Sequence, residues 1–320
     1  MPKVLITRTL PDSVMAAARD AFDVATRDSE MPMTAEEAAA TLSLYDAVLP
    51  TLGDAYSAQA FGLVPEPKVK LLANFGVGYN HIDVGAAKAA GVAVANTPGA
   101  VTDATADIAM MLILMSCRRA GEGERLVRAG DWTGWHPTQL LGLHLGGKTL
   151  GIVGMGRIGK AIARRAQAGF GMEVIFHNRS RVADAGVPAR QVDTLDELAR
   201  AADVVVLAVP ATPETRHLVD AGFLSAMRPH ARLVNIARGD IVDEAALIAA
   251  LEAGEIGGAG LDVYEGEPQV PQALRDRDDV ALLPHLGTAA LEVREAMGMM
   301  AVENLRAFFA GETPPNLVEP

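Results

Sequence analysis

Residues 149–160 read TLGIVGMGRIGK, and they constrain the fold more than any other stretch of the chain. An apolar run, Thr149–Val153, predicts a strand. Gly154, Gly156 and Gly159 follow it, and a helical sequence comes next. The first glycine permits a tight turn, the second lets the backbone approach a pyrophosphate, and the third lets the helix pack against the strand. The helix N-terminus favours phosphate. This context predicts a dinucleotide-binding unit, and an ordinary glycine-rich turn is the alternative.

The rest of the chain alternates short β-rich runs with Ala-rich helical stretches, which predicts βαβ units and parallel sheets. The expected strands are 4–7, 47–49, 71–74, 92–95, 149–153, 173–177, 203–208, 232–236, 258–263 and 280–283, and the expected helices are 12–21, 83–90, 102–129, 157–168, 243–253 and 288–310. Residues 130–148 predict an irregular loop. Since 320 residues exceed one average domain, we expect two α/β blocks.

Composition narrows the class of protein. The chain has 28 basic and 40 acidic residues. A net charge of −12 gives no electrostatic attraction to nucleic acid or to an anionic membrane. The start has no signal-peptide pattern, and the longest apolar run, Ile108–Cys117, is too short to span a bilayer. The single cysteine cannot form an internal disulfide. We therefore expect a cytoplasmic protein that binds neither nucleic acid nor membrane.

The residues after the strand 173–177 bear on the choice of dinucleotide. An acidic residue often ends this strand and binds the ribose 2′-hydroxyl of NAD. Here the strand is followed by Asn178, Arg179, Ser180 and Arg181. The arginines can pair with a 2′-phosphate, which a carboxylate would repel. We therefore predict that NADPH is preferred and that NADH is possible. A solvated pair of charges is the alternative.

Four stretches of the sequence carry a recognisable set of motifs. They are NFGVGYNHID at 74–83, NTPG at 96–99 with TDATAD at 102–107, the glycine fingerprint, and the series NIARG at 235–239, GLDVYEGEP at 260–268 and PHLG at 284–287. Together they resemble the D-isomer-specific 2-hydroxyacid dehydrogenases, most closely the glyoxylate/hydroxypyruvate reductase branch. The resemblance covers nearly the whole chain.

The resemblance implies an α/β fold of two Rossmann-like, doubly wound parallel-sheet domains with a cleft between them. The substrate-binding domain would be discontinuous and flavodoxin-like, made of residues 1–99 and 285–320. The dinucleotide-binding Rossmann domain would be inserted at residues 100–284.

The resemblance also assigns catalytic roles. A 2-oxoacid reductase needs a cation to hold the carboxylate and an acid to protonate the alkoxide. Arg238 would bind the substrate, because a guanidinium grips a carboxylate in a bidentate way. His285 would be the general acid/base, with Glu267 as its partner. Glu265 is the competing partner, but the family motif places the catalytic Glu directly before Pro. Taken singly, each residue has an ordinary structural explanation.

Further contacts follow from the same resemblance. The backbone N–H groups of Val77 and Gly78 would bind the substrate. Trp135 would reach a neighbouring subunit's active site or pack in a dimer interface. The expected cofactor contacts, besides the three glycines and residues 178–181, are Thr105, Arg157, Ile158, Val209, Pro210, Ile236, Ala237, Asp262 and Gly287. For Thr105 the alternative is a helix cap or core hydroxyl, and for Asp262 it is a structural bond at a strand end.

The sequence thus predicts a homodimeric, NADPH-preferring reductase of small 2-oxoacids, converting glyoxylate to glycolate and hydroxypyruvate to D-glycerate. Alternative substrates are 2-ketogluconate and an aromatic 2-oxoacid. The phosphoglycerate branch is disfavoured because Asn178 replaces the usual acid. Outside enzymes, the alternative is a dinucleotide-gated, corepressor-like binding protein. No metal site is expected, because the histidines lack partners at ligand spacing.

Overall fold

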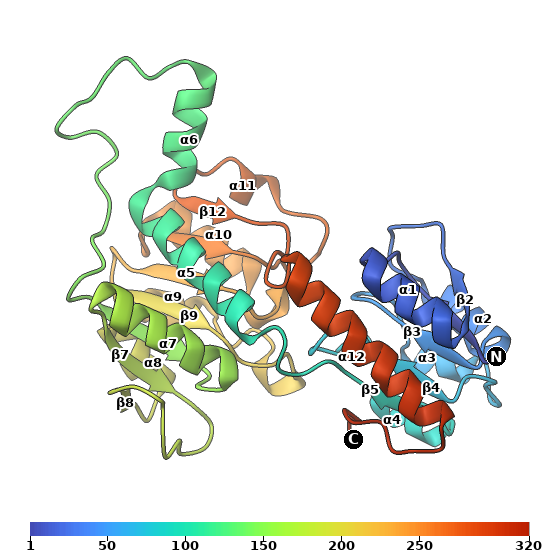
Figure 1. The fold of residues 1–320 in the computed structure, drawn as a ribbon. Coiled ribbons are helices and arrows are strands. Elements are labelled where there is room, and N and C mark those ends of the chain that lie inside the picture. The colour runs from blue at the N-terminus through green and yellow to red at the C-terminus, as the bar shows by residue number, and fades with distance from the viewer. Residues whose placement is uncertain (320) are drawn as a thin grey trace. The chain divides into compact units, whose positions relative to one another are not determined.

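The computed structural model describes residues 1–319, and the chain divides into two compact units. The first unit comprises Met1–Val101 together with the chain from Ala289 onward, and the second unit comprises Thr102–Thr288. Each unit is an α/β fold built on its own parallel sheet, which confirms the predicted fold class (Figure 1). Among the described residues, no helix combines the length and apolar character needed to cross a membrane.

In the first unit, five parallel strands lie in the order β2-β1-β3-β4-β5. The strands are β1 (Lys3–Ile6), β2 (Asp23–Thr26), β3 (Ala47–Leu49), β4 (Leu71–Ala73) and β5 (Ala93–Ala95), and the helices are α1 (Asp12–Ala21), α2 (Ala35–Leu44), α3 (Ala58–Gly62), α4 (Val84–Ala89) and α12 (Leu291–Phe309). The strand order reverses between β1 and β3. In open α/β sheets, ligands bind at the carboxyl ends of the strands beside such a switch point.

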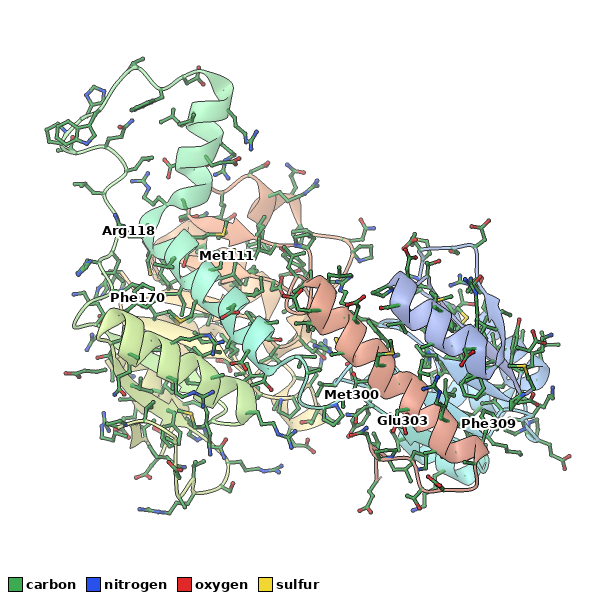
Figure 2. All side chains as sticks on the ribbon, viewed as in Figure 1. Met111, Arg118, Phe170, Met300, Glu303 and Phe309 are labelled. Carbon is green, nitrogen blue, oxygen red and sulfur yellow. The ribbon has the colours of Figure 1, made fainter. Side chains whose placement is uncertain are left out.

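Two apolar cores cover the two faces of this sheet, because successive side chains of a strand point to opposite sides. Val4 and Ile6 pack with α1 and α12, whereas Leu5 packs with α2, α3 and α4. The ring of Phe309, labelled at the end of α12 in Figure 2, lies 5.7 Å from that of Phe22. The first unit is therefore assembled from two separate pieces of the chain.

In the second unit, seven parallel strands lie in the order β12-β11-β10-β9-β6-β7-β8. The strands are β6 (Thr149–Val153), β7 (Glu173–His177), β8 (Arg190–Gln191), β9 (Val204–Leu207), β10 (Arg232–Asn235), β11 (Gly258–Leu261) and β12 (Val280–Leu282). The helices are α5 (Thr102–Arg118), α6 (Ala120–Ala129), α7 (Arg157–Phe170), α8 (Leu195–Ala201), α9 (Ala221–Ala226), α10 (Glu244–Ala253) and α11 (Gln272–Arg275), with short 3-10 turns η1 (Pro213–Thr215) and η2 (Gly239–Ile241).

The central strand β9, Val204–Leu207, is wholly apolar for a structural reason. Val204 and Val206 face the core that contains α5 and α7, while Val205 and Leu207 face the core that contains α8, α9 and α10. All four side chains are fully buried. A strand covered on both faces has no solvent-facing position, so its sequence does not alternate.

The predicted single helix over 102–129 is wrong. It is broken at Arg119, which has a φ of 52° and a ψ of 38° and separates α5 from α6. Figure 2 labels Arg118 where α5 ends. The C=O of Cys117 accepts the N–H of Leu143 at 2.7 Å, so the carbonyl that would continue the helical ladder is used by the returning chain. The guanidinium of Arg119 then pairs with Glu122 in the first turn of α6.

Residues 22–46, where no strand or helix is predicted, contain β2 and α2. A signal for α2 was present. Thr34 and Glu37 form a capping box, in which the N–H of Glu37 donates to Oγ1 of Thr34 at 3.2 Å and the N–H of Thr34 donates to Oε2 of Glu37 at 2.9 Å. Helices are expected between most strands of the second unit, but no range is predicted for the short elements α3, α8, α9, α11 and β8. The other predicted strands and helices end within three residues of the observed ones.

Candidate active site

The glycine loop connects β6 to α7 in the second unit. Gly154 has a φ of 99°, and a Cβ there would lie 2.7 Å from both the C=O oxygen of Ala208 and Cγ1 of Val209. A Cβ on Gly159 would lie 2.2 Å from the C=O oxygen of Gly154. In contrast, a Cβ on Gly156 would meet nothing within 4 Å. This open space at the N-terminus of α7 fits the pyrophosphate of a dinucleotide.

Four other predicted contacts lie around this loop. Arg157 and Ile158 are the first residues of α7, whose leading N–H groups have no intrahelical partner. Val209 and Pro210 follow β9, the neighbour of β6. Pro210 is exposed, and its C=O accepts the hydroxyl of Thr215 at 2.8 Å. The structure therefore brings these residues to the same edge of the sheet as the glycines.

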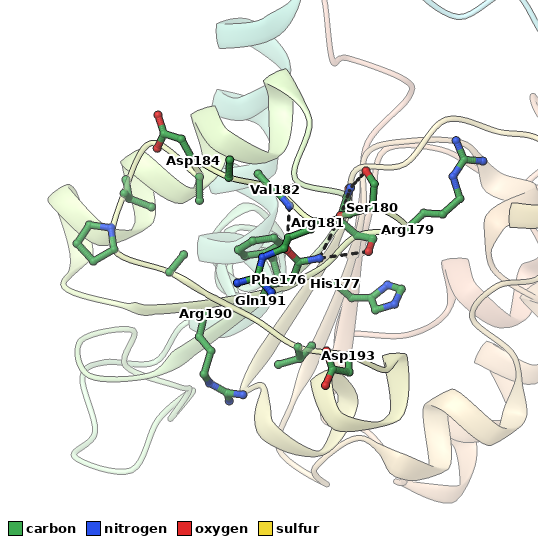
Figure 3. A pocket seen from close by; sticks show the side chains of 17 residues that line it. Phe176, His177, Arg179, Ser180, Arg181, Val182, Asp184, Arg190, Gln191 and Asp193 are labelled. Carbon is green, nitrogen blue, oxygen red and sulfur yellow. Dashed lines mark hydrogen bonds between the residues drawn. The ribbon is translucent and has the colours of Figure 1, made fainter.

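The 178–181 segment follows β7, on the other side of β6. Oδ1 of Asn178 accepts the N–H of Met155 at 3.2 Å, and Nδ2 of Asn178 donates to the C=O of Ser180 at 3.0 Å. Arg179 and Arg181 are exposed. Residues 176–185 and 187–193 line a pocket of about 780 Å³ (Figure 3). Asn178 therefore ties the arginine-bearing segment to the glycine loop.

Arg238, Glu267 and His285 lie in the loops after β10, β11 and β12, three neighbouring strands. Nδ1 of His285 and Oε2 of Glu267 are 2.9 Å apart. Oε1 of Glu267 accepts the N–H of Tyr264, also at 2.9 Å. The side chains of His285 and Glu267 are 29% and 30% exposed, so a ligand can reach a partly desolvated pair. The carboxylate beside the imidazole is that of Glu267, not Glu265.

The charges of this cluster support one another. Burial alone would raise the pKa of Glu267, but the hydrogen bond and charge of His285, with the N–H of Tyr264 and the charge of Arg238, outweigh it, so this pKa lies below its ordinary value. An ionised carboxylate only accepts hydrogen bonds, so Nδ1 of His285 carries the shared proton. Desolvation lowers the pKa of Arg238, and the carboxylates of Glu267 and Asp240 oppose that effect.

A set of hydrogen bonds holds the loop that carries His285. The buried carboxylate of Asp262 accepts the N–H groups of Leu286 at 2.6 Å and Gly287 at 2.9 Å. The hydroxyl of Thr105 donates to the C=O of Gly287 at 3.1 Å. Held in this way, His285 keeps a left-handed φ of 54°. Thr105, Asp262 and Gly287 thus anchor this loop, and their cofactor contacts stay predictions.

Asn235 is a site residue that sequence reasoning missed. Its buried side chain donates from Nδ2 to the C=O of Arg238 at 2.8 Å and accepts the N–H of Ala237 at 3.0 Å. These bonds hold the turn that carries Arg238, and Ile236 and Ala237 are buried within that turn at the strand end. An Asn immediately before a turn was the available signal, since its side chain bonds to the backbone a few residues on.

Glu265, the competing partner of His285, is engaged elsewhere. Its Oε1 accepts hydrogen bonds from Arg216 at 2.8 Å and from His217 at 2.9 Å. The hydrogen bond from His217 is the main reason that the pKa of Glu265 lies below its ordinary value. This carboxylate therefore belongs to a separate cluster of charges.

Two predicted substrate contacts lie in the first unit. Val77 and Gly78 are in the loop after β4, half-buried. In the second unit, Trp135 lies in the irregular loop between α6 and β6, and 77% of its surface is exposed.

Comparison with known proteins adds independent information. The model of the D-isomer specific 2-hydroxyacid dehydrogenase NAD-binding domain matches residues 110–287. A glyoxylate reductase of Thermococcus onnurineus (strain NA1) is 43% identical over 322 residues, which cover 99% of this chain and 96% of that protein. The chain belongs to the D-isomer-specific 2-hydroxyacid dehydrogenase family. This 2-hydroxyacid dehydrogenase is therefore an oxidoreductase with a NAD-binding domain, as the motifs indicated.

Other members of the family show similar agreement. A glycerate dehydrogenase of Hyphomicrobium methylovorum is 41% identical over 312 residues, covering 97% of this dehydrogenase and 96% of that protein. Among solved structures, the NADPH-dependent glyoxylate/hydroxypyruvate reductase of Sinorhizobium meliloti in complex with NADP and malonate is similar at a TM-score of 0.86. It is 36% identical and covers 99% of this chain and 96% of its own.

Proposed function

We propose that this 2-hydroxyacid dehydrogenase is an NADPH-preferring reductase of small 2-oxoacids that converts glyoxylate to glycolate and hydroxypyruvate to D-glycerate. The observation that carries the proposal is the 2.9 Å pair of His285 and Glu267, on strand ends beside that of Arg238. The names of the relatives, glyoxylate reductase and glycerate dehydrogenase, support this substrate class. The second unit would bind the dinucleotide, and the first would bind substrate.

In this mechanism, the guanidinium of Arg238 donates two parallel hydrogen bonds to the carboxylate of the oxoacid. Its charge also stabilises the negative charge that develops on the carbonyl oxygen. A nicotinamide dinucleotide, when bound, supplies the hydride. His285 donates the proton of Nε2 to the developing alkoxide, while Glu267 holds Nδ1 and stabilises the imidazolium. The N–H groups of Val77 and Gly78 donate to the substrate as well.

The preference for NADPH rests on the 178–181 segment. Two exposed arginines and no carboxylate follow the strand, and Asn178 holds the segment against the glycine loop. A guanidinium pairs with a phosphate through charge-assisted hydrogen bonds. The S. meliloti relative, described as NADPH-dependent, supports the same choice.

The test is a cofactor and substrate panel on purified protein. Oxidation of NADPH and NADH is followed with glyoxylate, hydroxypyruvate, 2-ketogluconate and an aromatic 2-oxoacid. We expect the highest kcat/KM with NADPH and one of the first two acids. No turnover with any of them at millimolar concentration would refute the enzymatic proposal and favour a dinucleotide-gated binding protein.

The variant Arg179→Ala tests the cofactor preference directly. Removing a charge-assisted hydrogen bond should raise the KM for NADPH by roughly 10- to 100-fold and leave that for NADH unchanged. Arg190→Ala is the matched control, because Arg190 lines the same pocket but is paired with Glu197 at 2.6 Å. Equal effects of Arg179→Ala on both cofactors would show that Arg179 is not the partner of the 2′-phosphate.

We further propose that the active form is a homodimer joined through α6 and the 130–148 loop, which extend away from the sheet of the second unit (Figure 1). Val127, Trp132, Trp135 and Leu141 each expose more than half of their surface. Large apolar side chains gathered in one segment are typical of an interface. Trp135 would then reach the active site of the partner subunit. Sedimentation at micromolar concentration should give the dimer mass, and a monomer would refute this proposal.

A further inference from the structure

In the loop after β4 of the first unit, hydrogen bonds to the carbonyl oxygens hold three consecutive peptide groups. Nδ2 of Asn74 donates to the C=O groups of Gly76 and Gly78, at 3.1 Å each. Nδ2 of Asn96 donates to the C=O of Val77, between them, at 2.9 Å. Two asparagine side chains thus fix the orientation of three successive peptide planes.

The orientation of these carbonyls determines where the following N–H groups point. In a trans peptide, a C=O and the next N–H point in opposite directions, and the peptides of this loop are trans. The N–H groups of Val77, Gly78 and Tyr79 therefore point away from the asparagines. Within residues 1–319, none of these three N–H groups donates to another backbone or side-chain acceptor. Successive N–H groups of this kind form a concave surface that binds anions.

A histidine holds the first asparagine in place. Asn74 is fully buried, and its Oδ1 lies 3.0 Å from Nε2 of His81. The carbonyl oxygens of Gly76 and Gly78 can only accept, so the amide must turn its NH₂ group toward them and its oxygen toward the imidazole. Nε2 of His81 consequently carries the proton of this hydrogen bond. The ring thereby selects one of the two orientations of the amide.

We propose that Asn74 and Asn96 are positioning residues that aim the three N–H groups of residues 77–79 at the carboxylate of a small anion. His81 keeps Asn74 in the orientation that this requires. The inference rests on the proposed function, in which two of these N–H groups donate to the 2-oxoacid. It adds the N–H of Tyr79 as a third donor and names the side chains that set the geometry.

The test measures the binding of oxalate, a small dicarboxylate, by calorimetry on the full-length protein saturated with NADPH. Asn74→Asp keeps the size of the side chain but places an oxygen against two carbonyl oxygens, which must then turn away. We expect the Kd for oxalate and the KM for glyoxylate to rise roughly 10- to 100-fold, the range for a lost hydrogen bond to a charged group. The KM for NADPH should stay within about twofold of wild type.

Rescue by a conservative variant distinguishes positioning from general support of the fold. His81→Phe removes the donor that orients Asn74, whereas His81→Gln retains a side-chain N–H. We expect oxalate binding to weaken in the first variant and to recover most of the wild-type affinity in the second. Equal affinities in the two variants would contradict the role given to His81.

A matched control removes a different buried hydrogen bond of the same unit. Oγ1 of Thr41 and the hydroxyl of Tyr56 are 2.7 Å apart, and neither side chain bonds to the loop after β4. Thr41→Val should lower the melting temperature and leave oxalate affinity unchanged. If Asn74→Asp fails to fold, Asn96→Ala, which releases only the C=O of Val77, replaces it with the same expected direction.

The outcomes separate this inference from the proposed function. If wild type reduces glyoxylate while a folded Asn74→Asp or Asn96→Ala variant binds oxalate as tightly as wild type, the positioning role is refuted and the reductase stands. If wild type binds oxalate with the expected dependence on Asn74 but reduces no 2-oxoacid, the anion site stands and the reductase is refuted. Absence of oxalate binding by wild type would overturn the anion site itself.

Discussion

Gly239 is the point at which the loop that carries Arg238 touches the loop that carries Glu267, and Gly239→Ala should separate them. A Cβ at this position would lie 1.8 Å from the carbonyl carbon of Tyr264 and 2.2 Å from the backbone nitrogen of Glu265. Both neighbours are backbone atoms, so no side chain can rotate out of the way. Arg238 directly precedes this glycine, and Glu267 lies two residues after Glu265.

The displacement can be read from these distances. An ordinary contact of a Cβ begins at 3.4 Å, so the Cβ of the variant is short by about 1.6 Å. A shift of about 1 Å in a catalytic group can lower the rate by about 100-fold. Forcing a methyl group into a packed region destabilises a fold by about 1–3 kcal/mol. We therefore expect Gly239→Ala to lower kcat by about 100-fold with a modest fall in melting temperature.

The assay is steady-state oxidation of NADPH with glyoxylate, together with calorimetric melting. Gly169→Ala is the control, because a Cβ at this helical position would meet nothing within 4 Å, and it should leave kcat unchanged. A Gly239→Ala variant with wild-type kcat would show that the two loops can separate freely. The reasoning that Arg238 and Glu267 must be held together would then be wrong.

Three other outcomes can be measured. Arg238→Lys should lower kcat/KM on the order of 100-fold, because an ammonium cannot make two parallel hydrogen bonds. Unchanged kinetics would contradict the proposed contact of Arg238 with the substrate carboxylate. Gln191→Met should raise the KM for NADPH but not for NADH, because the amide of Gln191 bonds Val182 and Ser180 in the arginine-bearing segment (Figure 3). Asp203→Asn should destabilise the fold by about 1–3 kcal/mol at pH 7. Burial opposes ionisation of Asp203, but hydrogen bonds from Thr149, His230 and Arg228 outweigh it and hold its pKa below the ordinary 3.8. The stabilisation is present above pH 3.8 and is lost as pH falls below it, so melting curves of wild type and variant should converge in acid.

Local patterns predict much of the fold, whereas the grouping of Arg238, Glu267 and His285 in one site comes from the resemblance to the family. The glycine spacing between a strand and a helix places the βα unit at Gly154, and apolar runs of four or five residues place most of the strands. The motifs at Arg238, Glu267 and His285 follow strands that prove to be neighbours. In a parallel sheet, residues at the carboxyl ends of neighbouring strands meet, so the observed strand order explains how these three motifs come together.

The rest depends on partners far away in the sequence. The break at Arg119 follows from a hydrogen bond between Cys117 and Leu143, in a loop with no regular pattern. The hydroxyl of Thr105 donates to a residue 182 positions further on. Such hydrogen bonds depend on how the elements pack, and no local pattern in a single sequence predicts them.

The two-piece construction of the first unit has a consequence for the order of folding. Residues 1–101 contain all five strands of its sheet, but α12, which covers one face of that sheet, is synthesised after the entire second unit. During synthesis, therefore, Val4 and Ile6 lack part of their apolar cover while the continuous second unit can already complete its own sheet. Since domains generally fold as units while the chain emerges, we expect the second unit to mature first. A chain stopped before residue 291 would retain a whole second unit and a first unit with an exposed apolar face.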